Sequence, residues 1–215
     1  MISTEFLAGS FCVFFFSYFT GSIPFGYLIG KFNGLDIRRH GSNNIGATNI
    51  RRVLGKEWGI VCFLLDFLKG LFSVVFIGKW LGGQLAGVGV EWGQLLAVAG
   101  AIGGHVFPYT LDFRGGKGVA TALGALLAVA FGPVIIGAIV WYITFWKSRV
   151  VSLASIIAAI SLPLSAAILW ISKKGNIHGT SVLMMLIVAL LIIYRHKDNI
   201  QRLRSGKENK FSRKS

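Results

Sequence analysis

The stretch Gly118–Trp146, which reads GVATALGALLAVAFGPVIIGAIVWYITFW, decides how many times this chain crosses a membrane. Its 29 residues carry no charge. As one helix they would extend about 44 Å, which is too long for one upright span across a hydrocarbon core of roughly 30 Å. Gly132 and Pro133 lie in the middle, where a helix breaks. We therefore expect two short helices, over about residues 118–131 and 133–146.

The composition of the rest of the chain also indicates a membrane protein. Of its 215 residues 54% are apolar, only 30 are charged (22 Lys and Arg, 8 Asp and Glu), and the mean hydropathy is +0.68. A helical span needs roughly 20 apolar residues. Such stretches occur at about residues 6–30, 58–78, 92–111, 150–171 and 178–194. The chain is therefore predicted to be an all-α polytopic membrane protein, with one integral-membrane domain over residues 1–215 that ends in a cytoplasmic tail, 195–215.

The basic residues predict the orientation of the spans. The segment from Lys31 to Lys56 holds six of them, whereas only Glu5 is charged before the first span. If residues 118–146 cross twice, 18 of the 22 basic residues lie on the same side as that segment; if they cross once, only 10 do. Basic loops stay in the cytoplasm. We therefore expect seven transmembrane helices, with the N-terminus outside and the C-terminus cytoplasmic.

The net charge of +14 does not indicate a nucleic-acid partner, because the basic residues lie in loops between spans. An anionic lipid surface or a phosphorylated substrate explains them better. Cys12 and Cys62 lie inside apolar segments and are expected to be small buried side chains.

Three polar segments fall on the cytoplasmic side in this topology. They are GSNNIGATNIRR at 41–52, GGHVFPYTLDFRGGKGVAT at 103–121 and RHKDNIQRLRSGKE at 195–208. The second segment contains the elements of an anion-binding site. Gly115, Gly116 and Gly118 can offer backbone N–H groups, Lys117 supplies a positive charge, and a helix is expected to begin just after them. A plain loop with one basic residue is an equally good interpretation of these residues alone. The loop is not a Walker A motif, because Lys117 is followed by Gly118.

The other two segments are ambiguous by themselves. Ser42, Asn43, Asn44, Thr48 and Asn49, followed by Arg51 and Arg52, could be turn and capping residues at a membrane boundary. His196 and Asn199 are three residues apart, so they share one face of a helix that continues out of the last span.

The remaining ionisable residues are weaker candidates. We expect His105, near Pro108, to be a structural hydrogen-bonding residue, and His40 and His178 to stand alone. Asp66 and Lys69 lie one turn apart within a span, as a functional pair or as charges that neutralise each other.

Several kinds of site are excluded by their missing motifs. The sequence has no HExxH, no CxxC and no cluster of His with carboxylates, so a metal site is not expected. It has no GxSxG nucleophile elbow. No His is followed five residues later by Asp, so the HxxxxD pair of the better-known glycerolipid acyltransferases is also absent.

Taken together, the three segments resemble the acyl-phosphate-dependent glycerol-3-phosphate acyltransferases of bacteria (the PlsY family). Their patterns GSxNxGATNxxR, GHxFPxxxxFxGGKGVAT and RHxxNIxRLxxGxE occur here in order, and the likeness covers nearly the whole chain. It departs at Lys207, where the family usually has Thr. The resemblance implies transfer of a fatty acyl group from acyl phosphate to the 1-hydroxyl of sn-glycerol 3-phosphate. The products are lysophosphatidic acid and inorganic phosphate, in the first committed step of bacterial phospholipid synthesis.

The resemblance also implies the site residues. The functional positions are Ser42, Arg52, Lys117, His196 and Asn199. Acyl phosphate is assigned to Gly115, Gly116, Lys117 and Gly118, and glycerol 3-phosphate to Ser42, Arg52, His196 and Asn199. Structural residues near the site are Asn44, Thr48, Asn49, His105 and Glu208. No cofactor and no metal are implied, and the base is either substrate phosphate or His196.

The implied surroundings are the bacterial inner membrane, membrane lipids and an active site that faces the cytoplasm. An upstream enzyme that forms acyl phosphate is a possible partner. The competing hypotheses are a small transporter or channel for an anionic metabolite, and a lipid-binding scaffold. A transporter would spread polar residues through both halves of the membrane, whereas the predicted topology gathers them on one face.

Overall fold

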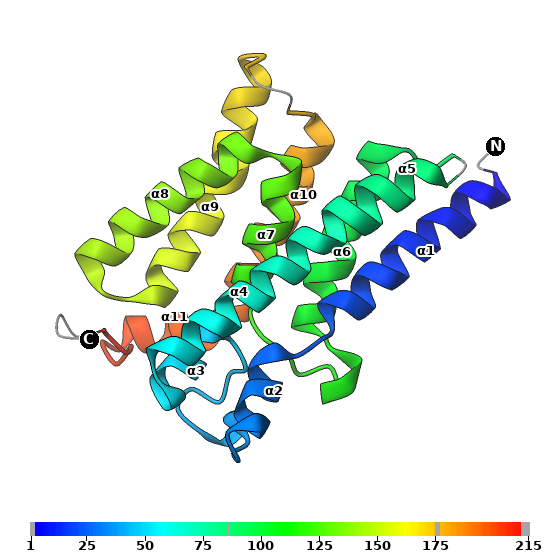
Figure 1. Cartoon of the computed structure of the whole chain (residues 1–215). Helices are drawn as coiled ribbons and strands as arrows, with labels where there is room; N and C mark the ends of the chain where they lie inside the picture. Colours follow the sequence, from blue (N-terminus) through cyan, green and yellow to red (C-terminus); the bar gives the residue numbers. More distant parts are fainter. Residues whose placement is uncertain (1–2, 86, 175–176, 212–215) are drawn as a thin grey trace. The chain divides into compact units, whose positions relative to one another are not determined.

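The computed structural model describes residues 3–85, 87–174 and 177–211, and every regular element in these ranges is helical (Figure 1). The chain forms two compact units, Met1–Val129 and Ala130–Ser215. The all-helical class predicted from the sequence is confirmed for the part of the chain described. The units are treated one at a time below.

The first unit holds ten helical segments in its described residues. These are α1 (Thr4–Gly21), α2 (Phe25–Phe32), η1 (Ile37–Arg39), α3 (Ala47–Leu54), α4 (Lys56–Phe72), η2 (Ser73–Leu81), α5 (Gly82–Gln84), α6 (Val90–Val106), η3 (Tyr109–Leu111) and α7 (Val119–Val129). Helix α1 lies along α6, and α4 lies along α7 (Figure 1). The short elements α2, η1, α3 and η3 carry the loops between these long helices.

Glycines allow the long helices to approach one another closely. A Cβ at Gly21 of α1 would overlap the backbone of Ala101 in α6, and one at Gly104 of α6 would overlap the backbone of Tyr18. Helices α4 and α7 meet in the same way where Gly70 faces Thr121. Small residues at helix interfaces are how membrane helices pack, because lipid tails give no hydrophobic drive for association. The first unit is thus held by backbone-to-backbone packing.

The first expected span, 6–30, is two helices rather than one. Helix α1 ends at Gly21 and α2 begins at Phe25. The break falls before Pro24, which has no N–H to donate and restricts the residue before it. Together the two helices still form one apolar stretch of 29 residues that is long enough to cross a membrane. The second expected span extends beyond 58–78, because α4 continues through the π-helical segment η2 into α5.

The uncharged stretch 118–146 is broken, as expected, but not where expected. Helix α7 ends at Val129, and α8 (Phe131–Ser148) begins after Ala130, whose φ of −149° and ψ of 83° are not helical. Pro133 lies in the first turn of α8, where its missing N–H has no helical partner to lose. Only α7 is short, with 11 residues, since α8 has 18. The expectation of two short helices is therefore wrong for the second one.

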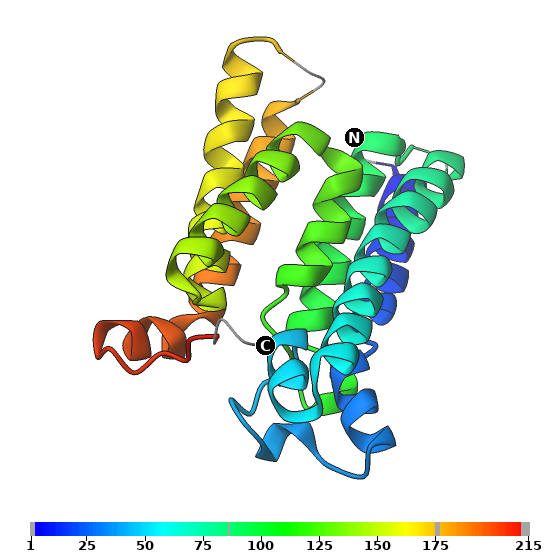
Figure 2. The same ribbon diagram turned by 60° about the vertical axis from the view of Figure 1, so that its left-hand side comes forward.

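The second unit is a bundle of three helices with a bent extension. Helix α9 (Val151–Ile171) contacts both α8 and α10 (Gly179–Arg195) (Figure 2). Helix α11 (Lys197–Arg204) follows α10 at a bend of 58°. The expected straight continuation of the last span is therefore wrong. His196 occupies the bend, with non-helical backbone angles.

The helices have the length and apolarity of membrane spans. Among the described residues, four stretches qualify, Thr4–Phe32, Lys56–Gln84, Phe131–Ser148 and Val151–Ile171, and the bent pair α10 and α11 gives a possible fifth. Large apolar side chains face outward, such as Phe11 at 64% exposed. This is the surface expected of a chain in lipid. The count of seven spans and the orientation of the termini stay predictions, because α6 with 17 residues and α7 with 11 are shorter.

Candidate active site

The first polar segment is organised by one buried amide, that of Asn49 in α3. Its side chain is 1% exposed, and its Nδ2 donates to the carbonyls of Asn44 at 2.8 Å and His40 at 3.0 Å. Its Oδ1 accepts the backbone N–H of Ser42 at 2.8 Å. A buried amide that both donates and accepts fixes a loop strongly, because each unmade bond would leave a buried polar group unsatisfied. The turn that carries Ser42 is therefore set by Asn49.

Ser42 and Arg52 meet at the same amide oxygen. Arg52 lies one turn after Asn49, and its Nη1 is 3.4 Å from Asn49 Oδ1. Both Ser42 and Arg52 are exposed. Asn44 supports the turn by accepting the N–H of Gly46 at 2.9 Å. Thr48 is half-buried on the same helix.

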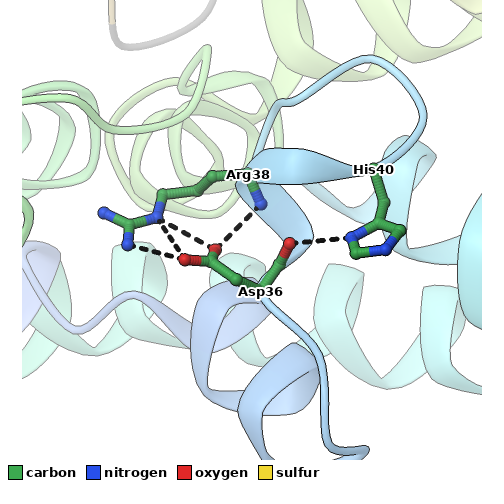
Figure 3. A network of polar contacts seen from close by, with 3 residues as sticks. All are labelled: Asp36, Arg38 and His40. Carbon is green, nitrogen blue, oxygen red and sulfur yellow. Dashed lines mark hydrogen bonds and ion pairs between the residues drawn. The ribbon is translucent and has the colours of Figure 1, made fainter.

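A second polar network braces the start of this loop (Figure 3). Arg38 donates from Nε and Nη2 to Asp36, with Nη2 to Oδ2 at 2.7 Å. These bonds hold the pKa of Asp36 well below its ordinary range. His40 Nδ1 bonds the carbonyl of Asp36 at 2.9 Å, so the expectation that His40 stands alone is wrong. The guanidinium of Arg38 also lies 4.7 Å from the centre of the Tyr27 ring.

The second polar segment joins the first through a small apolar core. Leu111 of η3 belongs to one buried cluster with Ile37, Ile45, Ile50 and others under the first loop. The hydrogen bond to Asp36 is the main cause of the raised pKa of Arg38, and the negative charge of Asp112, the residue after Leu111, adds a smaller contribution. The structure therefore brings two of the three predicted segments together within the first unit.

The glycine loop uses its backbone differently from the sequence expectation. The N–H of Gly115 donates to the carbonyl of Val106 at 3.1 Å, and that of Gly116 donates to the carbonyl of His105 at 3.1 Å. These two N–H groups are therefore not presented to an anion in this structure, and that expectation is wrong. Because the chain reverses direction around η3, the N–H groups of Gly115 and Gly116 point toward α6. Glycine is needed for close packing instead, because a Cβ at Gly116 would overlap the His105 ring.

Lys117 and Gly118 lie at the start of α7. Gly118 has a φ of +80°, which favours glycine, and its carbonyl accepts the N–H of Ala122 in the first turn. Lys117 is half-buried directly before it. A cation next to a helix N-terminus is a suitable setting for an anionic group.

Three buried ionisable side chains lie behind the glycine loop. Asp66 Oδ1 is 2.7 Å from Lys69 Nζ and 3.4 Å from His105 Nδ1. Lys69 Nζ also donates to the carbonyl of Ile23 at 2.8 Å, in the break between α1 and α2. The pair expected from the sequence is thus a trio, because His105 of α6 joins it.

In the second unit, the bend between α10 and α11 orients His196. The residue is 3% exposed, and its Nδ1 lies 2.7 Å from the carbonyl of Ile192. In the neutral ring this bond requires a proton on Nδ1, which leaves the lone pair on Nε2. Asn199, 6% exposed, lies one turn further along. The two are adjacent across the bend, although not on one straight helix.

Glu208 accepts hydrogen bonds from three side chains of the second unit. Its Oε1 accepts from Asn199 Nδ2 at 2.7 Å and from Ser152 Oγ at 3.0 Å, and its Oε2 accepts from Arg202 Nε at 2.8 Å. Burial raises the pKa of Glu208, but the three hydrogen bonds lower it by more, so its pKa lies below the ordinary value. Glu208 thereby connects the start of α9 to α11.

Several side chains of these networks, Arg38 among them, were not predicted from the sequence. Asp36 and Ser152 lie in unremarkable stretches and gain partners only in the fold. Arg202 had a signal, because it is three residues after Asn199 and inside the third motif. Within the described ranges 3–85, 87–174 and 177–211, no group of three His, Cys, Asp or Glu residues is arranged to hold a metal ion.

Comparisons with known proteins place these clusters in context. The family model described as glycerol-3-phosphate acyltransferase matches residues 11–206. A protein of that name from Aquifex aeolicus is 42% identical over 197 residues, covering 91% of this chain and 96% of its own. One from Geotalea daltonii is 44% identical over 197 residues, covering 92% and 95%.

Two solved structures are similar along the chain. The crystal structure of PlsY, an integral membrane glycerol 3-phosphate acyltransferase, in its glycerol 3-phosphate form has a TM-score of 0.82 and 38% identity, and the match covers 94% of this chain and 96% of that one. The lysophosphatidic acid form of PlsY gives a TM-score of 0.79 at 37% identity, with 94% and 95% covered.

Proposed function

This chain belongs to the glycerol-3-phosphate acyltransferase family and is a membrane enzyme that acylates glycerol 3-phosphate, and we propose that its acyl donor is a fatty acyl phosphate. The products are then lysophosphatidic acid and inorganic phosphate, and the reaction is the first committed step of bacterial phospholipid synthesis. Both proposed substrates carry a phosphate, so the site must offer two sets of cations and hydrogen-bond donors.

The observation that carries the proposal is the pairing of Ser42 and Arg52 on Asn49, beside the loop of Lys117. Ser42 N and Arg52 Nη1 approach the same Oδ1, and both residues are exposed. The Leu111 cluster joins this loop to the second one. A guanidinium grips phosphate in a bidentate way. Two anion-binding elements in one unit suit a reaction between two phosphorylated molecules.

The chemistry needs no nucleophile from the protein, because an acyl phosphate is already activated. The 1-hydroxyl oxygen of glycerol 3-phosphate attacks the acyl carbonyl carbon and forms the new ester C–O bond. The bond from that carbon to the phosphate oxygen breaks, and the phosphate leaves with its electron pair. The hydroxyl proton passes to phosphate, with His196 Nε2 as the alternative acceptor. Lys117 stabilises the charge that develops on the leaving phosphate.

We assign acyl phosphate to Lys117, Gly118 and the start of α7, with Gly115 and Gly116 shaping the loop through their bonds to α6. Glycerol 3-phosphate is assigned to Ser42, Arg52, His196 and Asn199. The hydrogen bond from Asn199 Nδ2 to Glu208 Oε1 orients the Asn199 side chain.

The proposed setting is the bacterial inner membrane, with seven spans, the N-terminus outside and the site facing the cytoplasm. An enzyme that forms acyl phosphate on the cytoplasmic side would supply the donor. Single cysteines in a background without Cys12 and Cys62 test the topology. A cysteine at Lys210 should be shielded from impermeant thiol reagents in intact cells, and one at Gly89 should react; the reverse pattern contradicts the topology.

Phosphate release tests the reaction itself. Purified protein with palmitoyl phosphate should release inorganic phosphate only when glycerol 3-phosphate is added, and lysophosphatidic acid should form in equal amount. Activity should survive EDTA, because Arg52 and Lys117 neutralise the phosphates without a metal. Arg52→Lys in the same membrane preparation serves as the low-activity control. If no phosphate is released in any detergent or lipid tried, acyl phosphate is not the donor.

A further inference from the structure

The buried trio Asp66, Lys69 and His105 has no part in the proposed reaction. The three residues are 2%, 5% and 5% exposed, respectively. They lie in α4 and α6 of the first unit, inside the apolar part of the chain. Ionised side chains in such surroundings are expensive to keep. Replacing a buried ion pair by apolar side chains of similar size is often neutral or stabilising, so stability alone does not account for them.

His105 connects the trio to the glycine loop. Its Nδ1 faces Asp66 Oδ1 at 3.4 Å. The opposite edge of the ring, at Nε2, lies where a Cβ of Gly116 would be, so the loop backbone rests on that edge. The carbonyl of His105 accepts the N–H of Gly116 at 3.1 Å. The imidazole thus lies between the Asp66 carboxylate on one side and the loop backbone on the other, directly before Lys117.

Lys69 connects the trio to the root of the other loop. Its Nζ is shared between Asp66 Oδ1 at 2.7 Å and the carbonyl of Ile23 at 2.8 Å. Ile23 lies in the break before α2, and α2 leads into the loop that carries Ser42. The same ion pair therefore reaches the supports of both anion-binding loops.

We propose that Asp66 is a positioning residue, which through His105 fixes the Gly115–Gly118 loop so that Lys117 faces the acyl phosphate. This role rests on the proposed function. A carboxylate behind an imidazole sets which ring nitrogen carries the proton and how the ring is turned. Without that partner the ring can rotate, and the loop loses the surface on which Gly116 rests.

Two double variants separate positioning from simple charge pairing. D66L/K69M removes both charges and every acceptor for His105 at that position. D66N/K69M removes both charges but keeps an amide oxygen that His105 Nδ1 can use. S73A is the matched control, because Ser73 is equally buried one turn from Lys69 and bonds only its own helix, at the Lys69 carbonyl.

Three measurements are made on each purified variant. They are the melting temperature, the KM and kcat for each substrate, and hydrogen exchange of the backbone amides in residues 113–118. We expect D66L/K69M to melt near the wild-type temperature. Its loop should exchange at least tenfold faster, and its KM for acyl phosphate should rise at least tenfold with a smaller change for glycerol 3-phosphate. D66N/K69M should recover most of both effects, and S73A should change neither.

If the loop of D66L/K69M exchanges at the wild-type rate and its KM and kcat are unchanged, the proposal is overturned. It is also overturned if D66L/K69M and D66N/K69M show equally fast loop exchange and an equally raised KM for acyl phosphate. Should D66L/K69M fail to fold, H105N decides. It keeps a donor to Asp66 but removes the ring edge beneath Gly116, so unchanged loop exchange contradicts the role of His105. Hydrogen exchange needs no substrate. If the wild type transfers no acyl group while the exchange differences hold, the proposed function fails and the loop-positioning role stands without its catalytic meaning.

Discussion

Asn49 and Glu208 both collect several hydrogen bonds on one side chain, one in each unit, but they do so with different chemistry. Asn49 is neutral and draws its partners from residues 37–52, close along the chain. Glu208 is charged, only accepts, and joins Ser152 to Asn199 and Arg202, across up to 56 residues of sequence. The first hub sets a local turn at any pH. The second holds its distant partners most strongly while it is ionised.

The largest effect is expected from Asn49→Ala. The change removes the hydrogen bonds from Asn49 to the carbonyls of Asn44 and His40 and from the N–H of Ser42, and each such bond contributes about 0.5–1.5 kcal/mol. Ser42 and Arg52 then lose their common support. We expect kcat/KM to fall roughly 100-fold or more, from a loss of about 2.7 kcal/mol or more. Asn44→Ala, which removes one bond at a half-buried position, is the control and should cost less than tenfold. Equal losses in the two variants contradict the hub.

A smaller loss is expected from Glu208→Gln. The amide can still accept from Asn199 or Ser152, but the charged partner of Arg202 is gone. Hydrogen bonds to charged groups contribute about 1.5–3 kcal/mol, so kcat/KM should fall roughly 10- to 100-fold, mainly through the KM for glycerol 3-phosphate. Asp198→Asn, on the same helix but exposed, should leave both constants unchanged. A Glu208→Gln enzyme with wild-type KM would remove Asn199 from the substrate site.

The arginines beside the two hubs should differ in their tolerance of lysine. Arg52 is assigned to phosphate, where a planar fork grips two oxygens and an ammonium does not. Arg52→Lys should lower kcat/KM about tenfold or more. Arg202 gives a single Nε bond to Glu208, which lysine can partly replace, so Arg202→Lys should cost only about two- to fivefold. The test is to measure kcat and KM of both variants under the same conditions. An equal loss of kcat/KM in the two variants contradicts the assignment of Arg52 to phosphate.

The smallest effect is a pH dependence that only one hub should show. The folded pKa of Glu208 is lowered, so its ionised form contributes stability that is complete above the ordinary pKa of a glutamate. That contribution is lost as the pH falls below the ordinary value and through the lowered one. The difference in Tm between wild type and Glu208→Gln should therefore shrink in that acid window. The difference between wild type and Asn49→Ala should persist, because an amide does not titrate.

Much of this architecture follows from the sequence because apolar stretches and prolines act locally. The uncharged run 118–146 predicted a broken helix, and a break occurs at Ala130. Its exact place depends on Pro133, which fits into a first turn as well as it ends a helix. Pro24 broke the first span for the same reason, although the stretch around it is apolar.

The site was less predictable wherever partners are distant in sequence. The motifs indicated Ser42, Arg52 and Lys117 as functional, and Asn49 as a supporting residue. They could not show that Gly115 and Gly116 donate to α6, because that depends on how the chain reverses at Asp112 and Phe113, both with positive φ. Likewise, spacing paired Asp66 with Lys69 but could not add His105 from another helix.

The glycine contacts between α1 and α6 leave those helices no freedom to slide or rotate past each other. At Gly21 and Gly104 the backbones of the two helices are already in contact. A shift of even a fraction of a turn would therefore bring side chains into collision with the backbone of the neighbouring helix. Helices α4 and α7 are locked by the same device at Gly70. The first unit therefore behaves as a stiff frame. Release of a product with a lipid tail must then rely on movement of the loops at the end of this unit, rather than on separation of its helices.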